Sequence, residues 1–166
     1  ILSRLVGSEM CIRDSHEAGH AFHSIYCGHL ELIGERSYPI EFAEVASMSM
    51  ELMTQNEWGE FYNDEEANRA RIGHLEGIIF LLPWIATIDS FQHWIYSNPG
   101  HTRDERKTVW NSIRDRFGSN MEWGDYQGHR DTSWQQQGHL FGVPFYYVEY
   151  GIAQLGALQL LSLIHI

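Results

Sequence analysis

Two histidines four residues apart, with a glutamate beside the first, are the residues of this chain best suited to metal chemistry. His16, Glu17 and His20 form the pattern H-E-x-x-H. On a helix, side chains at positions i and i+4 lie on one face, so both imidazoles can reach the same ion. Glu17 can then act as a general base on a water bound to that ion. Zinc lowers the pKa of such a water to about 7, which makes hydroxide available at neutral pH.

The five-residue pattern is not decisive by itself. With 10 His and 15 Glu among 166 residues, chance placement produces one match in roughly 5% of such chains. The competing interpretation is a surface helix with two solvated histidines. A catalytic zinc site needs a third protein ligand and an open position for water, so the third ligand decides between them. His23 shares part of the same face, but packing or support of a ligand is favoured over ligation for it.

Glu44 is the best candidate for the third ligand. It lies 24 residues after His20, near the start of a second predicted helix over residues 41–55. That helix can pack beside the first after a single loop. Glu41 and Glu51 are the competing candidates, and Glu41 could instead stabilise the N-terminus of the helix. Glu44 is expected on or beside the apolar face, where an unpaired carboxylate is costly, so a metal or a cationic partner is expected there.

A histidine and a group of tyrosines near the C-terminus form a second candidate constellation. Tyr147 and Tyr150 are three residues apart and share a helix face, while Tyr146 and Tyr150 share another. A tyrosine hydroxyl, or a nearby neutral histidine such as His139, can donate a hydrogen bond to an oxyanion. Periodicity alone favours the simpler interpretation, in which these tyrosines are core or interface aromatics.

The elements that must position these residues are helices. Five are predicted, over residues 16–27, 41–55, 64–96, 102–117 and 144–161. Ser15 is suited to cap the first and Gly28 to end it. Thr102 and Glu105 form a capping box. The apolar stretch 78–95 should be buried and kinked or broken at Pro83. The fold class is therefore all-α, helical and zincin-like with long loops and little or no β structure.

Composition excludes several classes of partner. The net charge of −11 disfavours nucleic acid and anionic membranes. Cys11 and Cys27 are the only cysteines, which is too few for a disulfide framework. We find no run of 18 apolar residues and no signal peptide, so a soluble cytoplasmic protein is the default expectation. Oligomeric state is left open.

Both ends of the chain look foreign to a folded domain. Residues 1–15 and 161–166 show no sustained helical or strand period. They resemble translated sequencing-adaptor DNA, so we expect a non-native leader and a non-native tail and exclude both from functional reasoning. The alternative for the leader is a genuine short arm or strand.

The segments between these ends resemble one peptidase family. Segments 16–23, 41–47, 88–96 and 138–150 are similar to the oligoendopeptidase F branch of the thimet-oligopeptidase-like zinc peptidases. The motifs occur in the right order, and the resemblance covers about residues 16–160. Members of that family have a helical region before H-E-x-x-H and continue beyond the tyrosines. Residues 16–160 are therefore expected to be part of a catalytic domain truncated at both ends.

The resemblance implies a specific activity. It implies one zinc ion per chain held by His16, His20 and Glu44, with Glu17 as the general base. It implies a largely helical protein with a deep channel that admits oligopeptides and excludes folded proteins. The predicted function is a zinc-dependent endopeptidase that hydrolyses oligopeptides. The alternative is a non-catalytic helical metal-binding fragment or interaction domain, inactive because the rest of the catalytic domain is missing.

The resemblance also assigns the aromatic segment. It implies that His139, Tyr147 and Tyr150 donate hydrogen bonds in the transition state, and Tyr150 aligns best. Tyr146 is the competitor of Tyr147, because its spacing from His139 differs by about one residue from that in better-known relatives.

Overall fold

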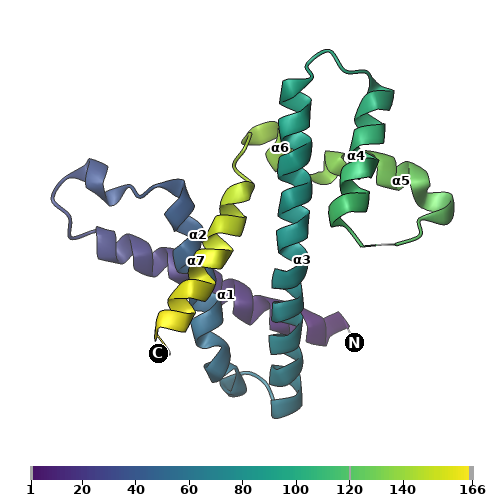
Figure 1. Ribbon diagram of the computed structural model, residues 1–166. Coiled ribbons are helices and arrows are strands. Elements are labelled where there is room, and N and C mark those ends of the chain that lie inside the picture. Colours follow the sequence, from purple (N-terminus) through teal and green to yellow (C-terminus); the bar gives the residue numbers. More distant parts are fainter. Residues whose placement is uncertain (1, 120, 165–166) are drawn as a thin grey trace. The chain divides into compact units, whose positions relative to one another are not determined.

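The computed structural model describes residues 2–119 and 121–164, and every regular element within these residues is a helix and none is a strand. The predicted all-α fold class is confirmed. The α-helices are α1 (Leu2–Cys27), α2 (Ile40–Met53), α3 (Asp64–Ser97), α4 (Arg103–Phe117), α5 (Gln127–Thr132), α6 (His139–Gly142) and α7 (Val148–Ile164) (Figure 1). Short 3-10 helices cover Ile33–Arg36, Thr54–Glu60, Gly124–Tyr126 and Ser133–Gln136.

The chain divides into two compact units, and α3 contributes to both. The first unit comprises Ile1–Ile78 and Glu149–Ile166, and the second comprises Ile79–Val148. Their charges differ sharply. The first unit contains fifteen acidic and five basic residues, whereas the second contains seven acidic and six basic residues. Nearly all of the net negative charge of the chain therefore belongs to the first unit.

Helices α1 and α2 of the first unit approach each other closely at Gly19. A Cβ atom at this position would lie 2.5 Å from Ser47 Cα and 2.6 Å from the carbonyl oxygen of Ala46. No side chain fits at such distances, so glycine is required where the two backbones meet. Beyond the crossing, Met48 and Leu52 of α2 belong to a buried apolar cluster. That cluster also includes Ile78, Ala153 and Ala157.

Helix α1 begins far earlier than predicted. It starts at Leu2, so Ser15 is an interior residue and not an N-cap. The Ser15 hydroxyl donates to the carbonyl oxygen of Cys11 at 2.9 Å and accepts from Thr54 Oγ1 at 3.1 Å. No proline occurs in residues 1–15, so nothing in the local sequence stops the helix from extending backward. The helix ends at Cys27, as predicted.

Helix α3 continues through Pro83, so the chain is not broken there as one prediction allowed. Burial follows one face. Ile78, Ile85 and Ile88 are buried, as predicted, whereas Ile79 and Phe80 are exposed. The proline lacks an N–H, and the carbonyl it leaves without a partner is that of exposed Ile79, which solvent can reach. The prediction that the whole stretch 78–95 is buried was therefore wrong for its outward side.

Although it holds no uninterrupted run of 18 apolar residues, α3 is long and apolar enough, by length and composition alone, to cross a membrane. Within the 34 residues of α3, an 18-residue window has a mean hydropathy of 1.4, which meets the length and composition of a spanning helix. Only 22% of that window is buried. One such helix is weak evidence for a membrane protein, because core helices of soluble proteins pass the same test.

In the second unit, α4 turns back alongside the second half of α3 (Figure 1). The predicted capping box is present, since Thr102 Oγ1 accepts from the Glu105 amide at 3.2 Å and the Glu105 carboxylate accepts from the Thr102 amide at 2.7 Å. Ile88, Phe91 and Trp110 are fully buried in the core of this unit. Burial of these side chains accounts for the pairing of α3 with α4.

The last third of the chain departs from the prediction in two places. Between the predicted helices 102–117 and 144–161, where no helix was predicted, the chain forms α5, α6 and two short 3-10 helices. The last helix begins at Val148 instead of Pro144. Phe145 has a φ of 61°, a left-handed conformation that cannot belong to a right-handed helix. The helix therefore starts only after this residue.

Candidate metal centre

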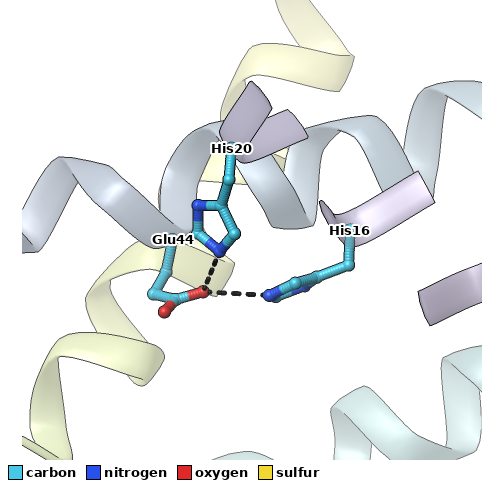
Figure 2. Close-up of side chains that lie close together, drawn as sticks. All are labelled: His16, His20 and Glu44. Carbon is cyan, nitrogen blue, oxygen red and sulfur yellow. Dashed lines mark ion pairs between the residues drawn. The ribbon is translucent and has the colours of Figure 1, made fainter. Parts of the chain in front are cut away.

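Three side chains predicted as metal ligands come together in the first unit. His16 and His20 extend from α1, and Glu44 extends from α2 toward both (Figure 2). The Oε2 atom of Glu44 lies 3.3 Å from His16 Nε2 and 3.7 Å from His20 Nε2. The candidate ligand atoms all lie within 4.8 Å of one another. Atoms that share one zinc ion at about 2 Å must lie roughly 3–4 Å apart, so the arrangement fits such an ion.

Glu44 is held in place by its own helix. Its side chain is buried, and Ser47 Oγ donates to its Oε2 at 3.0 Å. Ser47 is also the residue that Gly19 of α1 approaches. The close crossing of α1 and α2 therefore brings this carboxylate to the histidines. The hydrogen bond with His16 lowers the pKa of Glu44, against the opposing effect of burial.

Glu51 lies on the opposite side of the His16 ring. His16 Nδ1 donates to Glu51 Oε1 at 2.5 Å, while the other ring nitrogen faces Glu44. The hydrogen bond with Glu44, and after it in size the one with Glu51, raises the pKa of His16 from its ordinary 6.5 to about 10. The two carboxylates therefore stabilise a positive charge between them, and in this structure that charge is the additional proton of His16. A donor set of two imidazoles and a carboxylate, with a second carboxylate behind, fits a divalent cation.

Two further residues hold Glu51. His74 Nε2 of α3 donates to Glu51 Oε2 at 2.8 Å, and Gln55 Nε2 donates to His74 Nδ1 at 2.7 Å. Although burial opposes it, hydrogen bonding from His16 and His74 lowers the pKa of Glu51. Glu51 was considered at the sequence level as a competing ligand, and its place behind His16 was missed, as were His74 and Gln55. The one available signal was its spacing, seven residues beyond Glu44 and so on the same face of α2.

The other residues considered for this region do not join the three candidate ligands. Glu17 is exposed on α1, next to His16. The ring of His23 stacks on that of Tyr38, with centroids 3.8 Å apart and planes inclined by 16°. This is a packing contact. The side chain of Glu41, the other competing ligand, lies outside the described residues.

One family model matches nearly the whole chain. The model of peptidase family M3 matches residues 15–165. The chain belongs to peptidase family M3. The resemblance to that family inferred from the motifs is therefore confirmed. No curated protein matches the chain significantly.

Solved structures place the M3 chain near the oligoendopeptidase F branch. The chain is 34% identical to PZ peptidase A, solved with an inhibitor, and the two structures superpose with a TM-score of 0.81. The match covers 91% of this chain and 27% of that one. An oligoendopeptidase F structure at 3.1 Å is 35% identical, with a TM-score of 0.76 and coverages of 91% and 27%. A protein named as an oligoendopeptidase F from Bacillus anthracis str. Ames is 30% identical, with a TM-score of 0.69 and coverages of 91% and 24%. The M3 chain spans about a quarter of the length of these relatives.

The predicted hydrogen-bond donors of the M3 chain lie in both units. In the second unit, the His139 ring lies 4.8 Å from that of Tyr147 and 6.1 Å from that of Tyr146. Gln137 Nε2 lies 2.6 Å from His139 Nδ1. In the first unit, half-buried Tyr150 packs against the apolar cluster of α2 and α7. The structure describes each unit by itself, so the prediction that His139, Tyr147 and Tyr150 face the metal centre stays a prediction.

Proposed function

We propose that the M3 chain carries the zinc centre of a metallopeptidase that hydrolyses oligopeptides. The observation that supports this most is the convergence of His16, His20 and Glu44, with Glu51 behind His16. Three protein ligands leave a fourth position open, as in catalytic zinc sites. A zinc ion bound there would supply a Lewis acid and would lower the pKa of a water molecule.

The residues around the proposed ion have different roles. His16, His20 and Glu44 hold it. Glu51 accepts a hydrogen bond from Nδ1–H of His16, which keeps the proton on Nδ1 and leaves the Nε2 lone pair to face the ion. Glu17, exposed beside the first ligand, accepts the proton of the attacking water and passes it on to the departing amine.

The aromatic segment supplies the remaining stabilisation in this proposal. Negative charge develops on the carbonyl oxygen of the peptide bond during hydrolysis. His139, Tyr147 and Tyr150 are proposed to donate hydrogen bonds to that oxygen, with Tyr146 as the alternative to Tyr147. Neutral donors of this kind stabilise the transition state more than the ground state.

One observation favours a second candidate, a metal-binding chain without hydrolysis. The described residues expose large apolar side chains, including Ile79 and Phe80 of α3 and Leu163 of α7. Such surface is typical of regions that pack against other protein.

Metal content and hydrolysis, measured together, test both candidates. The purified chain and a longer parent protein are loaded with zinc, dialysed and assayed for metal and for cleavage of a quenched oligopeptide. One zinc per chain with cleavage in the parent supports the peptidase proposal. Zinc without cleavage in either protein supports the second candidate. Glu44→Gln should lose the zinc, whereas Glu57→Gln, at an exposed acid of the same unit, should keep it.

A further inference from the structure

A cavity of about 230 Å³ lies within the second unit, and no residue of the metal centre contributes to it. Gln92, Ile95 and Tyr96 of α3 line one side, and Arg106 of α4 lines another. Trp134 of a 3-10 helix and Phe141 of α6 are also among the lining residues. The walls are therefore mostly apolar, with one amide and one guanidinium group among them.

The amide of Gln92 is a buried donor without an acceptor. The residue is 2% exposed, and its Nε2 atom has no hydrogen-bond partner among the residues that the structure describes. Buried polar side-chain atoms are nearly always paired, because leaving a donor unpaired is destabilising. The described part of the chain supplies no acceptor for this amide, and because neighbouring atoms cover Nε2, an acceptor in the cavity reaches it by a rotation of the side-chain amide.

Arg106 is fixed by neutral contacts only. Its Nε donates to His101 Nε2 at 2.7 Å, and His101 Nδ1 lies 2.5 Å from the carbonyl oxygen of Asn98. Because Arg106 Nε is the donor, His101 Nε2 is the acceptor of that hydrogen bond, and Nδ1 is the ring nitrogen that can donate to the carbonyl oxygen. The Arg106 guanidinium also lies over the Trp134 ring, 5.3 Å from its centroid.

The charge of Arg106 is not compensated within the unit. Lys107, on the same helix, forms an ion pair with Asp131 at 2.7 Å, and Arg130 pairs with Asp115. Within residues 79–119 and 121–148, no carboxylate forms an ion pair with Arg106. A fixed guanidinium without a counter-ion, beside an unpaired amide, forms a site for an anion.

We propose that this cavity binds a small carboxylate that carries a single apolar group. Arg106 and Gln92 donate to the carboxylate, and Ile95, Trp134 and Phe141 contact the apolar group. Arginine matches the planar carboxylate geometry with two parallel donors. The volume is below the roughly 300–1,000 Å³ typical of pockets for larger ligands, so one side-chain-sized group fits.

Two sources supply this chemistry, namely a free small acid and the carboxyl-terminal residue of a peptide. The second rests on the proposed peptidase function, and the first does not. The binding experiment is therefore carried out on the full chain in the presence of EDTA. Removing the metal prevents carboxylates from binding at the zinc centre, so the result is independent of whether that centre is active.

Calorimetric titration with N-acetyl-L-leucine and N-acetyl-L-leucinamide tests the proposal. We expect saturable binding of the acid, with an affinity at least tenfold higher than that of the amide, because the neutral amide cannot form an ion pair with the guanidinium. If the tripeptide Gly-Gly-Leu binds more tightly than N-acetyl-L-leucine, the site is assigned to the carboxyl-terminal residue of peptides. If the two affinities are equal, the site is assigned to small free acids. Equal affinity for the acid and its amide, or no saturable binding, overturns the proposal.

Variants locate the binding in the cavity. Arg106→Met keeps an apolar stem beside Trp134 and should weaken acid binding tenfold or more. Arg103→Met, at an exposed arginine of the same helix outside the cavity, should leave it unchanged. Gln92→Leu should weaken binding without lowering the unfolding temperature, because it removes an unpaired buried amide. Should Arg106→Met fail to fold, Gln92→Leu decides, and unchanged affinity in that variant contradicts the proposal.

Discussion

The carboxylate of Glu51 lies 2.5 Å from Nδ1 of His16, whereas the carboxylate of Glu44 lies 3.3 Å from Nε2 of the same ring. One imidazole is therefore held between two carboxylates of the same helix. Glu44 occupies the ligand side, and Glu51 fixes the ring from behind. Metal-binding histidines in proteins usually have such a partner on the second nitrogen.

Removing Glu51 should weaken zinc binding. Glu51→Ala frees the His16 ring and should lower zinc affinity about 10–100-fold, as loss of such partners typically does. Glu51→Gln should have a smaller effect, because its amide oxygen still accepts from Nδ1. Competition titration against a chelator measures both, with Glu57→Gln as the control. Wild-type affinity in Glu51→Ala would show that the ring is oriented by other contacts.

Gly19→Ala should separate α1 from α2. The new Cβ would lie 2.5 Å from Ser47 Cα, so the helices must move apart. We expect destabilisation of about 1–3 kcal/mol from overpacking, together with weaker zinc binding. Urea unfolding gives the first quantity and chelator competition the second. Gly73→Ala in α3, where no atom lies within 4 Å of the added Cβ, is the control and should be neutral or slightly stabilising. Equal behaviour of the two variants would mean that the crossing tolerates a side chain.

Glu17→Gln should retain zinc and lose hydrolysis in a protein that shows the proposed activity. Glutamine keeps the shape of the side chain but cannot accept a proton. A fall in kcat of about 10²–10⁴-fold at full zinc occupancy is expected. Near-wild-type turnover would remove Glu17 from the role of base.

Tyr150→Phe should lower kcat by about 10²-fold while KM stays nearly the same. The hydroxyl is proposed to act mainly in the transition state, and loss of one such donor typically has this cost. Steady-state kinetics on the longer parent protein provides the measurement. An unchanged kcat would leave Tyr150 as a packing residue of the cluster formed by α2 and α7.

The stability of the second unit should fall in acid through Asp131. This carboxylate accepts from Lys107 Nζ at 2.7 Å and from Asn111 Nδ2 at 2.6 Å, and these bonds lower its pKa from 3.8 to about 2. Because the folded-state pKa is the lower one, the stabilisation is present above about pH 4 and is lost as the pH falls toward 2. The contribution should be about 1 kcal/mol, since Lys107 is 55% exposed and solvent screens the pair. Unfolding temperatures between pH 5 and 2 should fall less steeply in Asp131→Asn than in the wild type. Parallel curves would contradict the assignment.

Local spacing was enough to predict that His16, His20 and Glu44 come together as candidate ligands, because i,i+4 geometry and a helix N-terminus are properties of short segments. The roles of Glu51 and His74 were not accessible in this way. Their contacts depend on how α1, α2 and α3 pack, and the crossing that permits the packing requires Gly19 at a position where the sequence shows only an ordinary small residue.

The helix boundaries show the same limit. The capping box at Thr102 was predicted correctly because its two residues lie three apart and satisfy each other. Ser15 was read as a cap, but its hydroxyl bonds back to Cys11 within a longer helix. The late start of α7 follows from the left-handed backbone of Phe145, which has no signature in a phenylalanine side chain.

The uneven distribution of charge has a kinetic consequence for the metal centre. The first unit, which contains His16, His20 and Glu44, has fifteen acidic against five basic residues. The negative electrostatic potential of this unit extends over roughly a Debye length, about 8 Å at physiological ionic strength. It attracts a divalent cation before the cation is coordinated. Added salt should therefore slow capture of the ion while leaving its escape almost unchanged, because escape depends on contacts too short for salt to screen.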